Sequence, residues 1–159
     1  MKFLSKNVTS SVLEMTYKMY VRPHLDYGDI IYHDQQPDMM TKLESIQYQA
    51  ALIVSKCWKG TSRIKLYTEL GWESLSKRRE FRRFSLYYKI LNDSAPPYLK
   101  EHIKVTQSNI TNRFSKSFFP FCQIGWNELK PELKNANTLQ EFKKIFKKGV
   151  FSFCRIDTE

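Results

Sequence analysis

Histidine and aspartate side chains gather near the start of the chain, and these residue types can bind a divalent metal ion. Six of them fall within fifteen residues: His24, Asp26, Asp29, His33, Asp34 and Asp38. Their spacing fits no recognised ligand pattern, such as two histidines one helical turn apart. Aspartate in a stretch interrupted by proline and glycine more often caps a helix or forms a turn. We therefore expect no metal site and no resident cofactor.

A run of five cations in the middle of the chain could bind phosphate groups. It consists of Lys77, Arg78, Arg79, Arg82 and Arg83, within two turns of an expected helix. The arginine guanidinium presents a fork that matches phosphate oxygens, so contact with a nucleic-acid backbone is the first hypothesis. Such a contact reads no sequence. The alternative is a solvated face whose arginines pair with Glu73, Glu80 or the aspartates upstream.

A second basic face is expected near the C-terminus. Apolar residues share one side of a helix there: Leu139, Phe142, Ile145, Phe146, Val150 and Phe153. Lysines share the other side: Lys143, Lys144, Lys147 and Lys148. A basic amphipathic helix can meet nucleic acid or an anionic membrane. More often its apolar stripe docks on the core and its lysines stay in water, so we treat this face as a secondary candidate.

Support for catalysis is absent from the sequence. There is no glycine-rich phosphate loop, no serine in an elbow between glycines, and no motif that joins a histidine to a cysteine or serine. We expect no catalytic residue. Three tryptophans, Trp58, Trp72 and Trp126, could stack on bases, but isolated tryptophans in a helical domain are usually core anchors.

The charge balance favours a polyanionic partner. The chain has 26 Lys and Arg against 16 Asp and Glu, a net charge of +10. Neutralising phosphates releases condensed counterions, although positive charge can also simply keep an aromatic-rich domain in solution. Three distant cysteines, Cys57, Cys122 and Cys154, suggest neither a zinc site nor a disulfide framework. No secretory signal or membrane span is recognisable, so we expect an intracellular protein, cytoplasmic or nuclear, without a membrane partner.

The elements that must position these side chains are expected to be helices. A capping box, Ser11 with Glu14, predicts a helix from near Ser11 that Pro23 kinks or ends. The clearest helix begins at Pro37 and has apolar residues at Met39, Leu43, Ile46, Ala50 and Ile53. A short helix follows from Ile64 to Leu70. A long helix should run from about Ser74 to Leu91, wet at its cationic end and buried at the other.

The C-terminal part of the chain is expected to form a smaller unit. Phe118, Phe119, Phe121, Ile124, Trp126 and Leu129 form an aromatic-rich cluster, and Thr138 with Glu141 makes a second capping box. Residues 104–117 lack any period and read as a linker. The expected fold is all-α: a small helical bundle over residues 1–103, the linker, and an aromatic-rich helical unit over residues 118–159.

Several segments, in order, resemble one protein family. The first are Tyr20–Tyr32, Leu43–Ala51, Lys59–Ser62 and Lys65–Leu75. The later ones are Arg78–Arg79, Tyr87–Leu91, Pro97–Leu99, Ser117–Pro120, Trp126–Leu129 and Phe142–Lys144. Together they resemble the region downstream of the polymerase core in reverse transcriptases of jockey-like non-LTR (LINE) retrotransposons.

The resemblance implies a thumb and connection region without the catalytic palm. The palm motif of such polymerases has two adjacent aspartates that bind magnesium, and no Asp-Asp pair occurs in the 159 residues. Magnesium would belong to that missing palm, so on its own the chain would not be an enzyme. The resemblance implies at most sequence-independent binding of RNA or of an RNA–DNA duplex. The alternative is a decayed or domesticated fragment that binds a protein partner, or itself, through exposed apolar surface.

Overall fold

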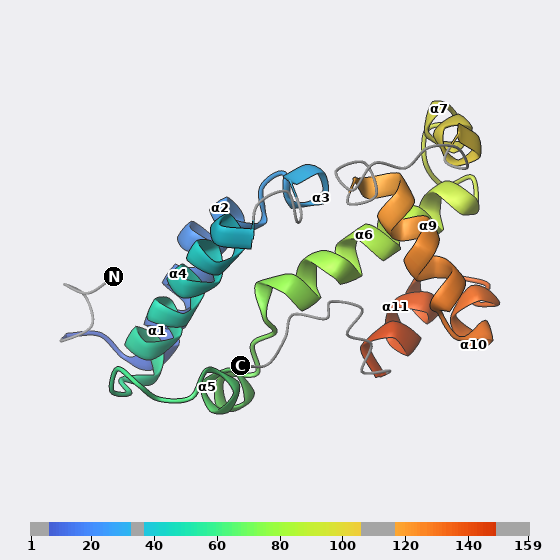
Figure 1. The fold of residues 1–159 in the computed structure, drawn as a ribbon. Coiled ribbons are helices and arrows are strands. Elements are labelled where there is room, and N and C mark those ends of the chain that lie inside the picture. Colours follow the sequence, from blue (N-terminus) through green and yellow to red (C-terminus); the bar gives the residue numbers. More distant parts are fainter. Residues whose placement is uncertain (1–6, 33–36, 106–116, 149–159) are drawn as a thin grey trace. The chain divides into compact units, whose positions relative to one another are not determined.

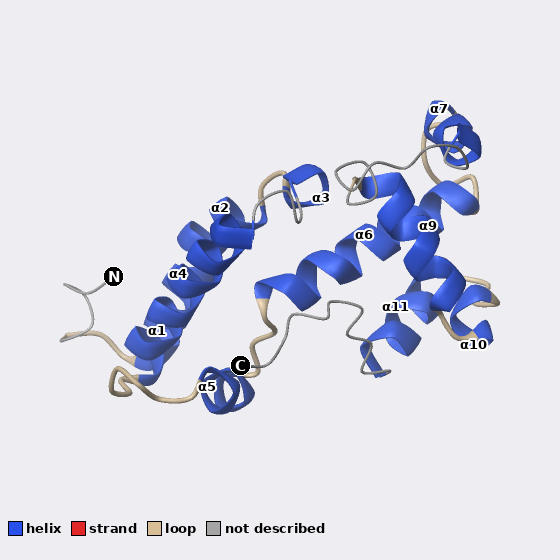
Figure 2. Cartoon of the chain, viewed as in Figure 1, coloured by secondary structure: helices blue, strands red, loops and turns tan. Residues whose placement is uncertain are grey.

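The computed structural model describes residues 7–32, 37–105 and 117–148, and its regular elements in these ranges are all helical (Figures 1 and 2). The all-α class expected from the sequence is confirmed. The helices before the middle of the chain are α1 (Ser10–Thr16), the π-helix η2 (Tyr17–Val21), α2 (Arg22–Asp26), α3 (Asp29–Tyr32), α4 (Pro37–Ser55) and α5 (Arg63–Leu70). Those that follow are α6 (Leu75–Leu91), α7 (Tyr98–Glu101), the 3-10 helix η3 (His102–Val105), α9 (Phe118–Glu128), α10 (Pro131–Lys134) and α11 (Leu139–Lys148).

The chain forms two compact units. Unit 1 comprises Met1–Asp29 with Gln36–Arg78, and unit 2 comprises Ile30–Gln35 with Arg79–Glu159. The division falls inside α6, whereas the sequence suggested that this whole helix belongs to the N-terminal bundle. The reason is that Phe84, Tyr87 and Tyr88, in the second half of α6, belong to the aromatic core of unit 2. Of the expected linker, Lys104 and Val105 lie in η3, and residues 106–116 lie outside the described ranges.

Unit 1 is organised around α4. Tyr17, Leu25, Ala50 and Leu75 form one buried cluster, in which the ring of Tyr17 stacks on Trp72 with 4.3 Å between centroids. A second cluster, Ala51, Leu52, Leu66 and Tyr67, joins α4 to α5. The buried face of α4 differs from the predicted one, because Met39 and Ile46 are 49% and 45% exposed while Gln47 is fully buried. The hydrogen bonds of Gln47, described below, compensate for burying its amide.

The N-terminal helix passes through Pro23 rather than stopping there. The π-helical turn η2 precedes it, and Pro23 lies at the start of α2. Proline lacks the N–H of an ordinary helical hydrogen bond, and a π turn changes the pairing just before it. The predicted capping box of this helix is wrong. Thr9 is the N-cap and makes no side-chain capping bond, while Glu14 accepts a hydrogen bond from Trp72 and pairs with Lys18.

Unit 2 has an aromatic core shared by α6, α9 and α11, whereas the sequence suggested an aromatic cluster within residues 118–159 alone. Phe84, Tyr87, Tyr88, Phe121, Cys122, Leu129, Leu133, Ala136, Phe142 and Phe146 are its buried members. The ring of Phe142 stacks on Tyr88, with 4.7 Å between centroids, and the Tyr88 hydroxyl donates to the Ala136 carbonyl at 2.7 Å. The N-cap bond of the second capping box is confirmed, since Glu141 N–H donates to Thr138 Oγ1 at 3.2 Å, and the Glu141 carboxylate accepts from Asn137 N–H, one residue before the cap, at 3.1 Å.

Gly125 gives a test of this core. A Cβ atom added there would lie 2.5 Å from Cζ of Phe84, whose side chain is 1% exposed and so has little room to move. We expect Gly125→Ala to lower the free energy of unfolding of unit 2 by about 1–2 kcal/mol, because overpacking outweighs the better helix propensity of alanine. Urea denaturation of the two proteins measures this. A second change, Phe84→Leu, should recover part of the loss, and a stabilised Gly125→Ala protein would contradict the packing described.

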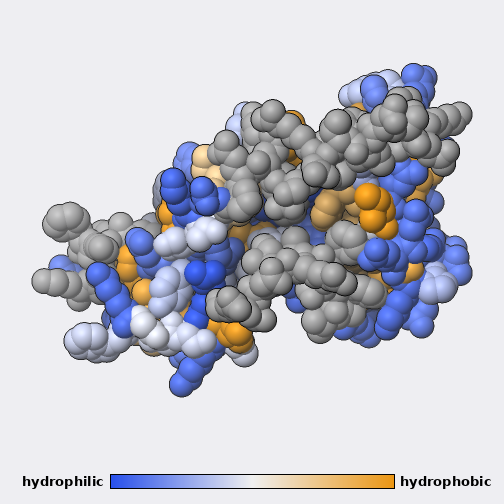
Figure 3. Space-filling model, in the orientation of Figure 1, coloured by the Kyte–Doolittle hydropathy of each residue, from blue (hydrophilic) through white to orange (hydrophobic). Residues whose placement is uncertain are grey.

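The described helices offer no membrane span, since none is long and apolar enough to cross a bilayer. On the face shown in Figure 3, hydrophilic residues cover much of the described surface, and hydrophobic residues form separate patches.

Candidate nucleic-acid interface

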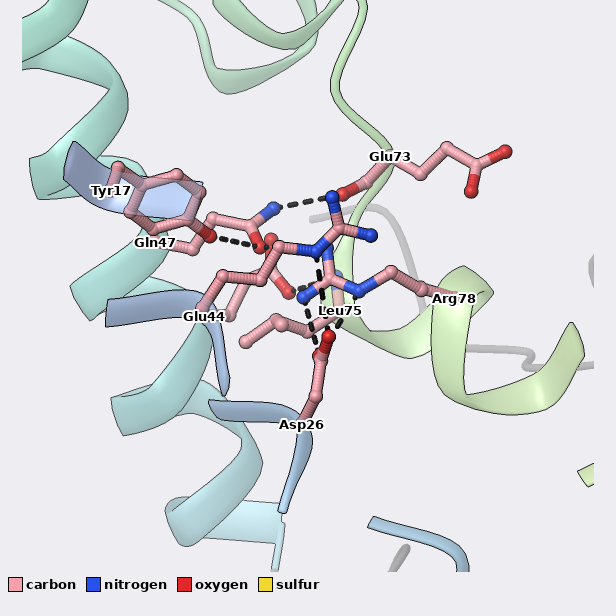
Figure 4. Close-up of polar contacts among 8 residues, drawn as sticks. Tyr17, Asp26, Glu44, Gln47, Glu73, Leu75 and Arg78 are labelled. Atoms are coloured by element: carbon pink, nitrogen blue, oxygen red, sulfur yellow. Dashed lines mark hydrogen bonds and ion pairs between the residues drawn. The ribbon is translucent and has the colours of Figure 1, made fainter. Parts of the chain in front are cut away.

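Arg78, the second member of the α6 cation cluster, is held by an aspartate rather than exposed. Its side chain is buried, and its Nη2 and Nε donate to Asp26 Oδ1 at 2.6 Å and 3.1 Å (Figure 4). Nη1 donates to Gln47 Oε1 at 3.3 Å. The other oxygen of Asp26 lies 3.4 Å from Nε of Arg22. The alternative in which an arginine of the cluster pairs with the upstream aspartates therefore holds for Arg78.

A polar network extends from this ion pair and anchors the start of α6 in unit 1. The hydroxyl of Tyr17 donates to Gln47 Oε1 at 3.0 Å, and Gln47 Nε2 donates to the carbonyl of Glu73 at 2.8 Å. Glu44 accepts from Leu75 N–H at 2.9 Å and from the Tyr67 hydroxyl at 2.8 Å. Burial raises the pKa of Tyr17. The network therefore joins η2, α2, α4, α5 and α6, and all of its members lie within unit 1 (Figure 4).

Arg79 and Arg83, one helical turn apart on α6, lie inside unit 2. They are 3% and 0% exposed, and Glu80 between them is 2% exposed. The guanidinium of Arg83 lies over the ring of Phe121, 4.4 Å from its centroid, and 5.7 Å from the centroid of Phe118. Both distances suit a cation–π contact. The cationic end of α6, expected to be solvated, therefore has three buried arginines. Arg83 packs on aromatic rings of unit 2, whereas Arg78 is held within unit 1.

Lys77 and Arg82, the two remaining members of the cluster, are partly exposed. Lys77 lies in unit 1 and Arg82 in unit 2. The structure thus separates the five cations into three buried side chains and two that reach solvent. Phosphate binding by the cluster stays a prediction, and Lys77 and Arg82 are the members whose exposure suits it.

The lysines of α11 form the more accessible basic surface. Lys144, Lys147 and Lys148 are exposed and Lys143 is partly exposed, while Phe142 and Phe146 are 0% and 3% exposed. Nζ of Lys147 lies 5.5 Å from the ring centroid of Phe81. The amphipathic arrangement expected for this helix is confirmed over Leu139–Lys148, and Val150 and Phe153 lie outside the described residues. We refer to Lys143, Lys144, Lys147 and Lys148 as the α11 lysine face.

The histidine and aspartate cluster is not assembled into a metal site in the part of the chain that the structure describes. No group of three or more possible ligands occurs there. Asp26 is engaged by Arg78 and Arg22, Asp29 is 4% exposed, and His24 is exposed. His33 and Asp34 lie outside the described ranges.

Cys122 is the buried thiol of the unit 2 core. Burial raises its pKa to about 12, although the charge of Arg83 opposes this shift. A thiol with so high a pKa is almost wholly protonated at neutral pH and is a poor nucleophile. Cys122 is therefore a packing residue of the unit 2 core.

Trp58 is where the structure departs most from the sequence expectation for the tryptophans. Trp72 and Trp126 are partly buried and pack in the cores of units 1 and 2, respectively. Trp58 is 88% exposed, so the expectation of a core anchor is wrong for this residue. It lies in the turn between α4 and α5. The signal in the sequence was its position between Lys56 and Gly60, outside any apolar period.

Comparisons with protein-family models, with curated proteins and with solved structures gave no match to this chain.

Proposed function

We propose that this chain is the non-catalytic, thumb-like C-terminal region of a non-LTR retrotransposon reverse transcriptase, and that it binds RNA or RNA–DNA duplex without sequence preference. The ordered resemblance of its sequence segments supports the family. The all-α fold agrees with a thumb, but many unrelated proteins share that class. The observation that carries binding is the α11 lysine face, where four lysines and one glutamate lie within ten residues over a buried aromatic stripe.

The proposed mechanism is electrostatic. Exposed ammonium groups displace counterions from the phosphate backbone, which gives affinity without base recognition. In unit 2 the partly exposed Arg82 adds a guanidinium, while Arg79 and Arg83 are buried and Arg83 lies over the ring of Phe121. Catalysis has no place in this function, because nucleotide transfer would require the magnesium-binding aspartates of a palm.

The test is binding of the purified chain to a fluorescent RNA–DNA hybrid over a salt series. The informative variant is Lys143→Gln, Lys144→Gln and Lys148→Gln, which leaves Lys147 on Phe81. We expect weaker binding at low salt and a salt slope smaller by up to about 0.9 for each phosphate that the variant no longer neutralises. The matched control changes three exposed lysines elsewhere in unit 2, Lys100, Lys130 and Lys134, to glutamine.

Equal losses in the two triple variants would show that net charge alone drives binding and that the α11 lysine face is no site. A folded wild-type chain that fails to bind the hybrid at low salt would contradict the proposed function. Circular dichroism of all three proteins checks that the substitutions leave the helices intact.

A second function, in protein interaction, is favoured by one observation on unit 1. Val12, Met15 and Met19, spaced by three and four residues on α1 and η2, are 48%, 59% and 60% exposed, and Tyr20 beside them is 68% exposed. Exposed apolar side chains that follow one another on a helix are typical of association surfaces. This function predicts self-association that persists at high salt, since apolar contacts weaken little as salt rises. Sedimentation velocity over the same salt series measures it.

A further inference from the structure

Trp58 has the largest exposed fraction of any large apolar side chain in the described residues, 88%. Tryptophan is rarely left in water to this degree, because its ring gains more from burial than most side chains. The neighbouring Ile64 is 76% exposed. An indole presented in this way is available to a partner that offers a flat apolar surface.

The turn that presents Trp58 is fixed by hydrogen bonds. Its carbonyl accepts from Thr61 N–H at 3.2 Å and from Thr61 Oγ1 at 2.9 Å. The Tyr48 hydroxyl, from α4, donates to the Thr61 carbonyl at 2.8 Å. Gly60 has φ +103° with no heavy atom near its Cβ position, so the turn requires glycine for its backbone conformation alone. The ring of Trp58 is therefore carried on a defined support, which lowers the entropy lost on binding.

The surroundings of Trp58 are cationic. Lys56, Lys59, Arg63 and Lys65 are all exposed. The sequence from Ser45 to Thr68 contains no aspartate or glutamate, and Glu69, one helical turn after Lys65 on α5, is the first acidic residue that follows. The guanidinium of Arg63 lies 5.7 Å from the ring centroid of Tyr48, which orients it beside the turn. An exposed aromatic ring with positive charges around it is the arrangement that single-strand binding proteins use.

We propose that the segment Lys56–Lys65, which we call the Trp58 turn, binds single-stranded nucleic acid, with an unpaired base stacked on Trp58 and phosphates held by the surrounding cations. An unpaired base exposes the face that an indole can stack on, whereas bases inside a duplex are already stacked on each other. A membrane surface is the less favoured partner. Interfacial anchoring relies on a continuous apolar face, and the turn has only Trp58 and Ile64 among polar residues.

This inference rests on the proposed function in that both assign nucleic acid as the partner. It adds single-stranded nucleic acid as a ligand of unit 1, whereas the proposed function places binding in unit 2. The α11 lysine face of unit 2 would hold a phosphate backbone of any form. The Trp58 turn of unit 1 would add a preference for unpaired bases.

The test uses the full chain and a fluorescein-labelled oligouridine of about twelve nucleotides, a length within the usual range of single-strand sites. Anisotropy titrations compare wild type with Trp58→Ala and Trp58→Phe. We expect Trp58→Ala to weaken binding by about 5- to 100-fold, the effect of losing one base–aromatic stack, and Trp58→Phe to keep most of the affinity. Tyr27→Ala is the matched control, because Tyr27 is 85% exposed in the same unit but follows Asp26 and lies near no cluster of lysines.

Three further measurements test this inference against its alternatives. Titration of the RNA–DNA hybrid should be affected less than 3-fold or so by Trp58→Ala, since a duplex offers no free base face. Cosedimentation with vesicles of anionic and neutral phospholipid tests the membrane. Because Trp58 is the most exposed of the three tryptophans, quenching of its fluorescence by oligouridine reports the stack directly.

The inference is overturned if Trp58→Ala binds oligouridine as wild type does, if Tyr27→Ala loses as much affinity, or if the wild-type chain binds vesicles and not oligouridine. Binding of the hybrid without binding of oligouridine would exclude the Trp58 turn as a binding site and would still support the proposed function. Oligouridine binding that needs Trp58, without hybrid binding, would support the Trp58 turn and contradict duplex binding by the α11 lysine face.

Discussion

Replacing Asp26 with asparagine is expected to lower the free energy of unfolding of unit 1 by about 2–3 kcal/mol, because it leaves the buried guanidinium of Arg78 without its counter-charge. The side chains of Arg78 and Asp26 are 9% and 17% exposed, with 2.6 Å between Nη2 and Oδ1. Asparagine keeps the shape and one acceptor oxygen, so the loss is less than that of a full truncation. Hydrogen exchange measured by mass spectrometry should show faster exchange in peptides from residues 10–26 and 37–55.

Asp93 provides the matched control for this prediction. It also forms an ion pair at 2.6 Å, with Lys100, but there the side chains are 46% exposed for Lys100 and 72% for Asp93. Asp93 has φ +52°, which asparagine tolerates, so Asp93→Asn removes the charge without backbone strain. Exposed ion pairs contribute about 0–1 kcal/mol. Equal losses from the two substitutions would mean that Asp26 and Arg78 are not a buried pair in solution.

The double variant Asp26→Asn with Arg78→Met extends the argument. Methionine fills much of the volume of the arginine stem and has no charge to leave unpaired, so part of the stability should return. Recovery would show that Asp26→Asn destabilises unit 1 by leaving the charge of Arg78 isolated. It would exclude a change at the end of α2, where Asp26 lies, as the main cause.

The arginines show how far sequence reasoning reaches at the candidate interface. The long helix over residues 75–91 was predicted because no glycine or proline interrupts it, and the apolar second half was recognised as buried. Burial of Arg78, Arg79 and Arg83 was not predictable from local pattern. Their partners, Asp26 and the rings of Phe118 and Phe121, lie about 35 to 50 residues away in the sequence. Only the tertiary fold brings such groups together, and it overrides the preference of guanidinium for water.

Sequence signals for helix ends were reliable where residues within one helical turn determine where the helix begins or ends. Thr138 with Glu141 forms a capping box, and Gly71 ends α5 in the left-handed conformation at φ +63°. The first capping box failed although its residue types were right, because Trp72, 58 residues away, takes the Glu14 carboxylate. The hydrogen bond from Lys18 and, after it, the one from Trp72 lower the pKa of Glu14. Trp58 shows the opposite error: its residue type favours a core position, but no core cluster of the fold includes it.

Replacing Phe142 with alanine is expected to have the largest effect in unit 2, a loss of about 3–5 kcal/mol in its free energy of unfolding. The side chain is 0% exposed, and its ring lies 4.7 Å from Tyr88, 5.7 Å from Trp126 and 5.8 Å from Phe146 between centroids. Helix α11 has ten residues, too few to be stable in isolation, so its helicity depends on this packing. Loss of α11 would also disperse the α11 lysine face.

Phe119 gives the control with the same atoms removed. It is partly exposed and makes an edge contact with Phe118, 5.1 Å between centroids, so Phe119→Ala should cost about 1 kcal/mol. Urea denaturation followed by the fluorescence of the tryptophans compares the variants, and hydrogen exchange assigns the loss to residues 118–148. Phe142→Leu should retain most of the stability because it keeps much of the apolar volume. If Phe142→Ala costs no more than Phe119→Ala, α11 does not pack through Phe142, and a lysine face fixed by that packing could not account for nucleic-acid binding.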